Sequence, residues 1–333
     1  WTASNATIVG GTLNLSDGQG FLFKPPPSSG RLTLDGLTIN GNLSLSGNAF
    51  IGFQNNIELN GEVTIGGSQT RFETYGDTTL NSGTYRFVQN PGNGISKLTI
   101  DTHGSLTLGS AVTVRGGTCS IVSGPLVNHG TILSDLPGKL FAVESQTFFN
   151  DGILKATNGG ILSVYCPSDQ TPLDGSLIAD GGQISLRGRL AFAPGANWSS
   201  TNDGQIHLLG HLNNNGRVLN IDSPAKSIAF EGTAIYDPRI IGGTVNISGG
   251  GELSIFETNS SVSYGTLQDV TVNGDLTLGH RRVLGVYDGA RFNGTVRVFE
   301  RMELGSLGNG TTVTLGGSGT IVLGNYHDPL DLT

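Results

Sequence analysis

The sequence is poor in charge, sulfur and aromatic residues, and it contains no long apolar run. Only 13% of its 333 residues are charged, 7% are aromatic, and there are 2 cysteines and 1 methionine. No apolar stretch reaches the ~18 residues of a membrane-spanning helix, so we predict no transmembrane segment. The net charge is −8, and only His280, Arg281 and Arg282 stand together as a basic group. A nucleic-acid partner is therefore not expected.

Glycine, by contrast, is abundant. The chain has 53 glycines, roughly twice the usual share of about 7%, while 36% of its residues are hydrophobic and recur in short alternating runs. Alternation of apolar and polar residues is typical of half-buried strands and not of disordered linkers. We therefore predict a folded all-β chain with many tight turns.

One phrase returns along the chain, namely two short alternating strands separated by a Gly, Asn or Asp turn. Residues 98–100 with 106–108 and residues 245–247 with 253–255 are examples. The phrases recur every 22 to 26 residues or so, which is the signature of a solenoid. No amphipathic helical stretch accompanies them. The sequence predicts a single right-handed parallel β-helix (β-solenoid) of about 14 rungs, on the order of 65 to 70 Å long, continuous over residues 1–333.

Corners and core of this solenoid can be assigned to residues. Asn and Asp followed by Gly tolerate the left-handed backbone of a sharp corner, and stacked Asn side chains can form amide ladders. The structural corner residues that we predict are Asn128, Asn150, Asp180 and Asn202. The residues that we predict to stack in the core are Leu154, Leu162, Leu177 and Ile184. Prolines predict loop excursions near residues 21–30 and 166–174.

The two cysteines, Cys119 and Cys166, lie 47 positions apart, close to two repeat periods. Stacked two rungs apart, they would be about 10 Å from each other along the axis, whereas a disulfide needs Cα atoms within about 7 Å. Two separate buried thiols are favoured, and a disulfide stays open. Two cysteines indicate no compartment, but several Asn-x-Ser/Thr sequons favour an extracellular or cell-surface location. Because the chain begins at Trp1 and Met302 is its only methionine, we expect a processed product or a part of a longer protein.

Residues 148–156, Phe-Phe-Asn-Asp-Gly-Ile-Leu-Lys-Ala, followed by Gly-Gly-Ile-Leu-Ser-Val at 159–164, resemble a repeat of large secreted bacterial β-helix proteins. These include autotransporter passengers, filamentous-haemagglutinin-like adhesins and planctomycete-type surface repeat proteins, all within the pectin-lyase-like β-helix group. The resemblance implies surface display and a structural or adhesive role. The sequence departs from autotransporters and from the other groups in that we predict within it neither a C-terminal membrane barrel nor an amphipathic capping helix.

Candidate catalytic and metal-binding residues are only weakly indicated by the sequence. Asp180 and Asp203 are 23 positions apart, as paired acids on neighbouring rungs would be, but each precedes Gly, where Asp serves the turn. Signatures of β-helix glycan hydrolases are missing. His207 and His211 are too far apart on one strand to share a metal ion, and only a bend at Gly210 would bring them together. Phe192 and Trp198 are either core residues or a sugar-stacking patch. We predict no catalytic residue, no metal and no cofactor.

An uncapped solenoid exposes unpaired strand edges, which invite association with another strand. The sequence therefore favours a non-catalytic extracellular rod, surface fibre or adhesin subunit that self-associates end to end, with surface glycans as a second partner class. The alternative is a carbohydrate-active β-helix enzyme or a tailspike-like glycan binder, which needs clustered functional side chains on one outer face.

Overall fold

A computed structural model describes most of the chain. The described residues are 6–15, 21–23, 31–45, 50–66, 70–88, 95–193, 196–214, 216–232, 237–256, 263–278, 282–299, 301–305 and 316–323, without the side chains of 21–23 and 166–171. All regular secondary structure in these residues is β-strand, and the named strands pair in parallel. The predicted all-β, parallel β-solenoid is confirmed. Within the described ranges, no helix is long and apolar enough to cross a membrane.

The chain divides into two compact units. Unit 1 consists of Trp1–Ile184 with Ala193–Asn197, and unit 2 of Ser185–Phe192 with Trp198–Thr333. Strands β20 (Gln183–Phe192) and β21 (Asn197–Thr201) contain residues of both units.

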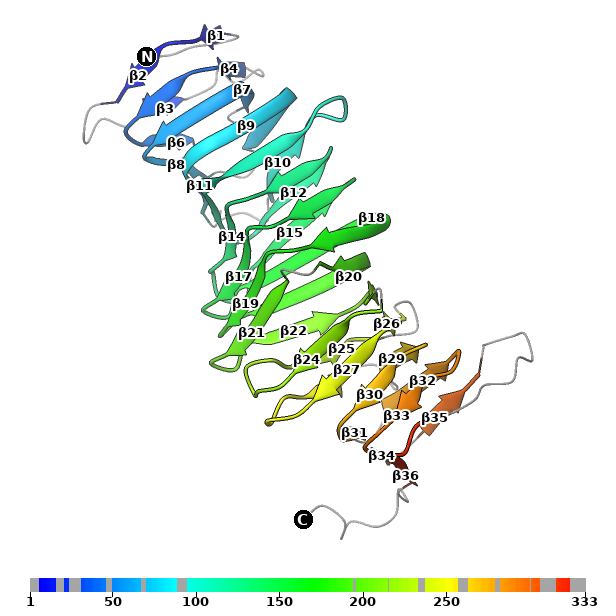
Figure 1. The fold of residues 1–333 in the computed structure, drawn as a ribbon. Helices are drawn as coiled ribbons and strands as arrows, with labels where there is room; N and C mark the ends of the chain where they lie inside the picture. The colour runs from blue at the N-terminus through cyan, green and yellow to red at the C-terminus, as the bar shows by residue number, and fades with distance from the viewer. Residues whose placement is uncertain are drawn as a thin grey trace. The chain divides into compact units, whose positions relative to one another are not determined.

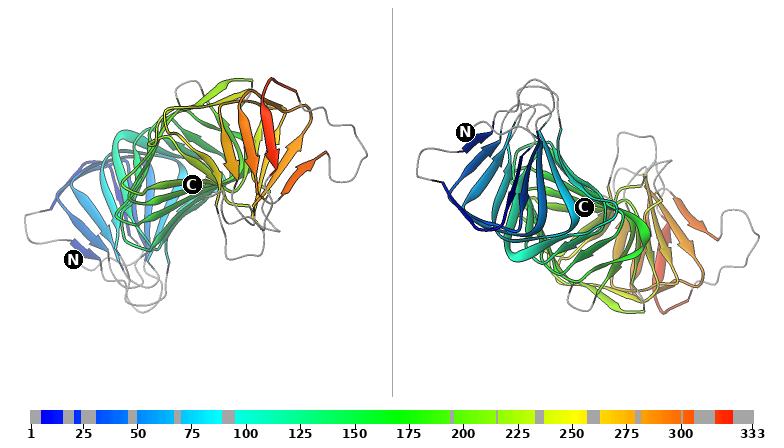
Figure 2. Two further views of the ribbon diagram at one scale, coloured as in Figure 1. Left: turned by 90° about the horizontal axis from the view of Figure 1, so that it is seen from below. Right: turned by 90° about the horizontal axis from the view of Figure 1, so that it is seen from above.

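In unit 1 the strands stack into three faces round a common interior (Figures 1 and 2). Strands β7, β9, β11 and β18 continue round corners and belong to more than one face. The first face contains β1 (Ala6–Val9), β4 (Arg31–Asp35), β7 (Phe50–Asn60), β9 (Arg71–Phe87), β10 (Ser96–Ile100), β12 (Cys119–Ser123), β15 (Leu140–Ser145) and β18 (Ile161–Leu173). The second contains β2 (Thr12–Asn14), β5 (Thr38–Asn40), β7, β9, β11 (Leu106–Gly116), β13 (Leu126–Asn128), β16 (Phe148–Asn150) and β18. The third contains β3 (Phe21–Phe23), β6 (Leu43–Leu45), β8 (Glu62–Ile65), β9, β11, β14 (Thr131–Ser134), β17 (Ile153–Thr157) and β19 (Ser176–Asp180).

Unit 2 repeats this three-strand pattern with its own faces. One contains β22 (Gln205–Leu208), β25 (Ile228–Phe230), β28 (Leu253–Ile255), β31 (Leu276–Leu278), β34 (Thr295–Val298) and β36 (Thr320–Leu323). Another contains β23 (His211–Asn213), β26 (Arg239–Ile241), β29 (Ser263–Gln268), β32 (Arg282–Tyr287) and β35 (Arg301–Leu304). The last contains β24 (Val218–Ile221), β27 (Thr244–Ile247), β30 (Thr271–Asn273) and β33 (Arg291–Phe292).

The length of a turn varies more than the sequence repeat suggests. The described residues form about 12 turns, slightly fewer than the 14 rungs expected. Val283 pairs with Arg301, 18 positions later, whereas His211 pairs with Arg239, 28 positions later. The register of the strands defines a turn, and the corners between them absorb insertions, so a period of 22 to 26 residues or so is only an average.

The core follows from strand alternation. Along the first face of unit 1, one inward position of each turn carries an aliphatic or aromatic side chain, and each is at most 1% exposed. These residues are Leu32, Ile51, Phe72, Leu98, Ile121, Val143 and Val164. Fully burying such a side chain contributes about 1.5 to 3 kcal/mol, so the repeated column supplies much of the driving force.

The residues predicted for the core lie inside it. Leu154 pairs with Leu177 across β17 and β19, and Leu162 pairs with Phe141 across β18 and β15. These three leucines and Ile184 are at most 1% exposed. Cys119 is a free, buried thiol, and burial raises its pKa. The side chain of Cys166 lies outside the described residues.

The structure describes the two loop excursions predicted from proline to different extents. Residues 21–23 form β3, and residues 24–30 lie outside the described part of the chain. The second stretch, 166–174, overlaps β18, which pairs with β15 at its beginning and with β16 at Leu173.

A matched pair of substitutions tests the core. Leu154 is fully buried, and Ile153, its neighbour on β17, is 36% exposed. We expect Leu154→Asp to destabilise the protein by ~4 kcal/mol or more, because it buries a charge. Ile153→Asp should change stability by about 0.5 kcal/mol or less. Urea unfolding followed by circular dichroism measures both, and equal effects would contradict the inward and outward assignment.

Candidate functional site

The predicted corner residues Asn128 and Asn150 lie at the ends of β13 and β16, and both are fully buried. Asn128 Nδ2 donates to Asn150 Oδ1 at 2.6 Å. Each is followed two positions later by glycine, and a Cβ on Gly152 would lie 2.9 Å from Asn128 Nδ2. The Asn-x-Gly pattern thus provides the amide ladder together with the space that it needs.

The other two predicted corner residues are more exposed. Asp180 ends β19, and its carboxylate lies 3.8 Å from Lys155 Nζ. Asn202 and Asp203 both have the left-handed backbone, with φ of 51° and 61°, which is the conformation expected of a sharp corner. Asp203 therefore serves a turn in the way that its place before Gly204 indicates.

Two further asparagine ladders, which the sequence period did not reveal, run along outer surfaces. In unit 1, Asn60 donates to Asn40 at 2.9 Å and Asn40 donates to Asn14 at 2.7 Å. In unit 2 the ladder consists of Asn220, Asn246, Asn273 and Asn293, with every Nδ2–Oδ1 distance 2.8 Å. An asparagine directly after an apolar residue, at or near a strand end, is the only signal in the sequence.

The aromatic pair of unit 2 is part of the protein interior. Phe192 and Trp198 stack with ring centroids 5.2 Å apart and an interplanar angle of 11°. They are only 5% and 8% exposed. Their stacking surfaces face each other, so this pair does not form an open platform for a sugar.

His207 occupies a covered polar position on β22. Its Nδ1 lies 2.6 Å from Glu231 Oε2, its Nε2 lies 2.9 Å from Gln205 Oε1, and its ring centroid is 4.5 Å from that of Phe256. His211, on the next strand, is half-buried, and burial followed by the charge of Arg239 lowers its pKa. Among the described residues, no group of three or more His, Cys, Asp or Glu side chains is arranged to hold a metal ion.

The most developed outer surface is the first face of unit 1. Arg31, Phe50, Arg71 and Lys97 occupy one outward position in four successive turns. Beside them a second outward column consists of Thr7, Thr33, Gly52, Glu73 and Thr99. Neighbouring strands are about 4.8 Å apart. The face therefore presents three cations in four successive turns, interrupted by Phe50, next to a column that carries hydroxyl groups and one carboxylate.

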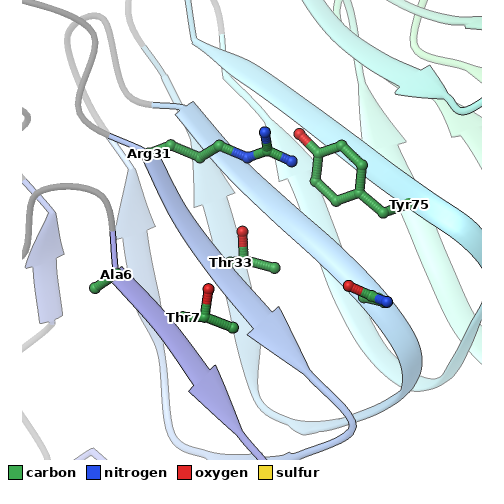
Figure 3. A pocket seen from close by; sticks show the side chains of 6 residues that line it. Ala6, Thr7, Arg31, Thr33 and Tyr75 are labelled. Carbon is green, nitrogen blue, oxygen red and sulfur yellow. The ribbon is translucent and has the colours of Figure 1, made fainter.

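Tyr75 stands at the centre of this face. A Cβ on Gly52 would clash with the Tyr75 ring, so the glycine makes room for the ring to lie across the strand. The Arg31 guanidinium lies 3.8 Å from the Tyr75 ring centroid and 5.4 Å from that of Phe50. Figure 3 shows the guanidinium pointing towards the Tyr75 ring. Such cation–π contacts hold a planar cation and a ring in a fixed arrangement.

The hydroxyl group of Tyr75 is fixed as well. It donates to Glu73 Oε2 at 2.9 Å. Burial, then the hydrogen bond to Glu73 and its negative charge, raises the pKa of Tyr75 well above its usual value, while the positive charge of Arg31 acts in the opposite direction. Tyr75 is therefore neutral at physiological pH and available as an apolar ring with a polar tip.

These side chains line two neighbouring hollows. The first, of about 510 Å³, is lined by Ala6, Thr7, Arg31, Thr33, Gln54 and Tyr75, which are shown in Figure 3. The second, of about 410 Å³, is lined by Thr70, Arg71, Glu73, Ile95, Lys97, Thr99, Val122 and Ser123. We call the two together the Arg31–Lys97 groove. It combines basic, aromatic and hydroxyl groups with the carboxylate of Glu73.

The sequence shows no gathering of basic residues here, because Arg31, Arg71 and Lys97 are 40 and 26 positions apart. Register pairing brings them into one column. A search with protein-family models finds no match to the chain, and neither do searches of curated proteins and of solved structures. The groove is therefore interpreted from its own chemistry.

The buried amide ladder gives a pH-dependent prediction. In Asn150→Asp, desolvation raises the pKa of the new carboxyl above its unfolded value of ~3.9. Its stability relative to the wild type should therefore fall as pH rises above ~4, with a penalty of about 3 kcal/mol or more at pH 7. Urea midpoints at pH 4 and pH 8 measure this. Asn40→Asp, in the exposed ladder, is the control, and an Asn150→Asp penalty independent of pH would contradict the buried assignment.

The role of Gly52 gives a second prediction. Gly52→Ala should force the Tyr75 ring away from the strand at little cost in stability, because only a side chain has to move. Released from Glu73 and from burial, Tyr75 should titrate closer to the ordinary value of ~10. Difference ultraviolet titration against the wild type measures the change, with Tyr75→Phe identifying the group. An unchanged tyrosine titration would show that the ring does not depend on Gly52.

Proposed function

We propose that the chain is a non-catalytic structural rod of the extracellular space or cell surface, a fibre or adhesin subunit that associates with further copies through its strand edges. The observation that carries this proposal is the apolar character of the described edge strands. Val9 of β1 is 71% exposed, and Leu323 and Val322 of β36 are 73% and 43% exposed. Among the described residues, β1 pairs only with β4, and β36 only with β34.

Open parallel edges have a natural partner in a second copy. An edge strand presents unpaired N–H and C=O groups, and a neighbouring strand satisfies them in the way that each internal turn does. Exposed Val and Leu side chains at such an edge add apolar contact area. The occupant that fits both features is another edge of the same kind.

Several observations support a structural and not a catalytic role. Asp203 serves a turn, and Asp151 and Asp180 pair with His129 and Lys155 of the neighbouring turn. Such carboxylates stabilise corners. The resemblance of residues 148–164 to repeats of secreted bacterial β-helix proteins supports the proposed location, and a surface role fits adhesin-like fibres of that group.

The second candidate function is glycan binding. The observation that favours it is the Arg31–Lys97 groove, where aromatic, basic and hydroxyl-bearing side chains converge on one outer face. A carbohydrate-active enzyme would need, in addition, an acid and a base placed on either side of a scissile bond.

Edge substitutions test the self-association. We expect the purified protein to form filaments by electron microscopy, with a meridional diffraction spacing of ~4.8 Å, the separation of strands along the axis. Val9→Lys and Leu323→Lys should each abolish the filaments, because a charge at an edge opposes strand addition. Val218→Lys, at an exposed valine of β24 that is 56% accessible, should leave them intact. Particles that stay monomeric in the wild type at all concentrations would refute the proposal.

A further inference from the structure

We propose that the Arg31–Lys97 groove binds a linear acidic polysaccharide. Its anionic groups would lie along Arg31, Arg71 and Lys97, and its sugar rings would pack against Tyr75. This inference goes beyond the structural role proposed above, because it uses a lateral face and not a strand edge.

The spacing of the cations favours a polymer with a regular charge pattern. Arg31, Phe50, Arg71 and Lys97 follow one another at the spacing of successive strands, ~4.8 Å. One saccharide unit has a comparable length, so a chain that runs across the strands meets a cation at three of four successive positions, with Phe50 between Arg31 and Arg71. Arg71 and Lys97 are exposed and face each other across β9 and β10. Two like charges at this distance repel each other, and an anion between them removes the repulsion.

The aromatic side chains favour a sugar as the body of the ligand. Tyr75 is half-buried, and its ring is held by the guanidinium of Arg31 and by the hydrogen bond to Glu73. Gly52 leaves room for the ring to lie across the strand. The ring is fixed before binding, so a sugar that contacts its exposed edge beside the Arg31 guanidinium costs little conformational entropy.

Both hollows are also lined by side chains that can hydrogen-bond to sugar hydroxyls. Thr7, Thr33 and Gln54 line the first hollow, and Thr99 and Glu73 line the second. These side chains offer donors and acceptors in a row beside the cations, as sugar hydroxyls require. Glu73 lies inside the groove, where it would accept hydrogen bonds from free sugar hydroxyls, which a polysaccharide offers on every unit and a nucleic-acid backbone largely lacks. A polysaccharide therefore fits better than a nucleic acid.

The test is binding of the full chain to immobilised polymers at low salt. We expect binding to polygalacturonate, which carries carboxylates, or to dextran sulfate, which carries sulfates, and the comparison identifies the anionic group. Neutral dextran should bind at least about tenfold more weakly, a difference of ~1.4 kcal/mol. The affinity should fall as salt rises, because the cations are exposed.

Charge-matched variants locate the site. Arg71→Gln/Lys97→Gln should weaken binding about tenfold. The control is Arg86→Gln/Lys155→Gln on the third face, which removes the same charge from side chains paired at 3.8 Å with Glu62 and Asp180. The control should bind as the wild type does. Gly52→Ala, which displaces Tyr75 and leaves all charges in place, should weaken binding as well. Thermal unfolding of each variant verifies that it is folded.

Several results would overturn the proposal. These are the absence of binding to both acidic polymers, equal binding to neutral dextran, tighter binding to single-stranded oligo-dT or to polyglutamate, and equal losses in the two double variants. Filament formation by Arg71→Gln/Lys97→Gln keeps this test separate from that of self-association. If this variant forms filaments but no longer binds the polysaccharide, the glycan site lies in the groove. If the protein binds the polysaccharide but does not form filaments, only the proposed self-association through strand edges is wrong.

Discussion

In-register parallel stacking is the constraint on which the rest of the structure depends. Each residue of a strand has an equivalent residue one turn away at ~4.8 Å. The equivalent residues of successive turns therefore form columns, and each side chain contacts its neighbours in the same column. An inward column is largely apolar, as from Leu32 to Val164 in unit 1, and the buried Asn128 and Asn150 are accommodated because they hydrogen-bond to each other. One buried charge would break contacts in the turns on both sides of it.

On the outer surface the same stacking places identical or similar side chains next to each other in successive turns, and only some residue types are stabilised by such a neighbour. Asparagine does, because each amide can donate to one neighbour and accept from the other, as Asn40 does between Asn14 and Asn60. Cations do not, since Arg71 and Lys97 in register repel each other. An Asn column is therefore explained by stability alone, whereas the adjacent cations Arg71 and Lys97 gain nothing from each other, and the proposed ligand would offset their repulsion.

The sequence predicts the core and one ladder because both depend on local patterns. Alternation marks Leu154 and Leu177 as inward, and the Asn-x-Gly pattern marks Asn128 and Asn150. The Arg31–Lys97 groove could not be predicted in this way. Its columns depend on which residues fall into register, and turns vary from 18 to 28 residues because corners absorb insertions. An error of one position in a corner reverses inward and outward for the following strand, so Arg31, Arg71 and Lys97 cannot be aligned without the fold.

Self-association and glycan binding make different demands on a solenoid, and the two are compatible. Strand addition uses main-chain groups at an edge, such as those of β1 or β36, and it leaves the lateral faces free. Every added copy would bring another Arg31–Lys97 groove, so a polymer of copies would present many identical sites to one long polysaccharide. Weak sites then act together, because each engaged groove raises the effective concentration of the next. A groove of modest affinity is thus sufficient for firm attachment in a fibre, although it would hold a single copy only briefly.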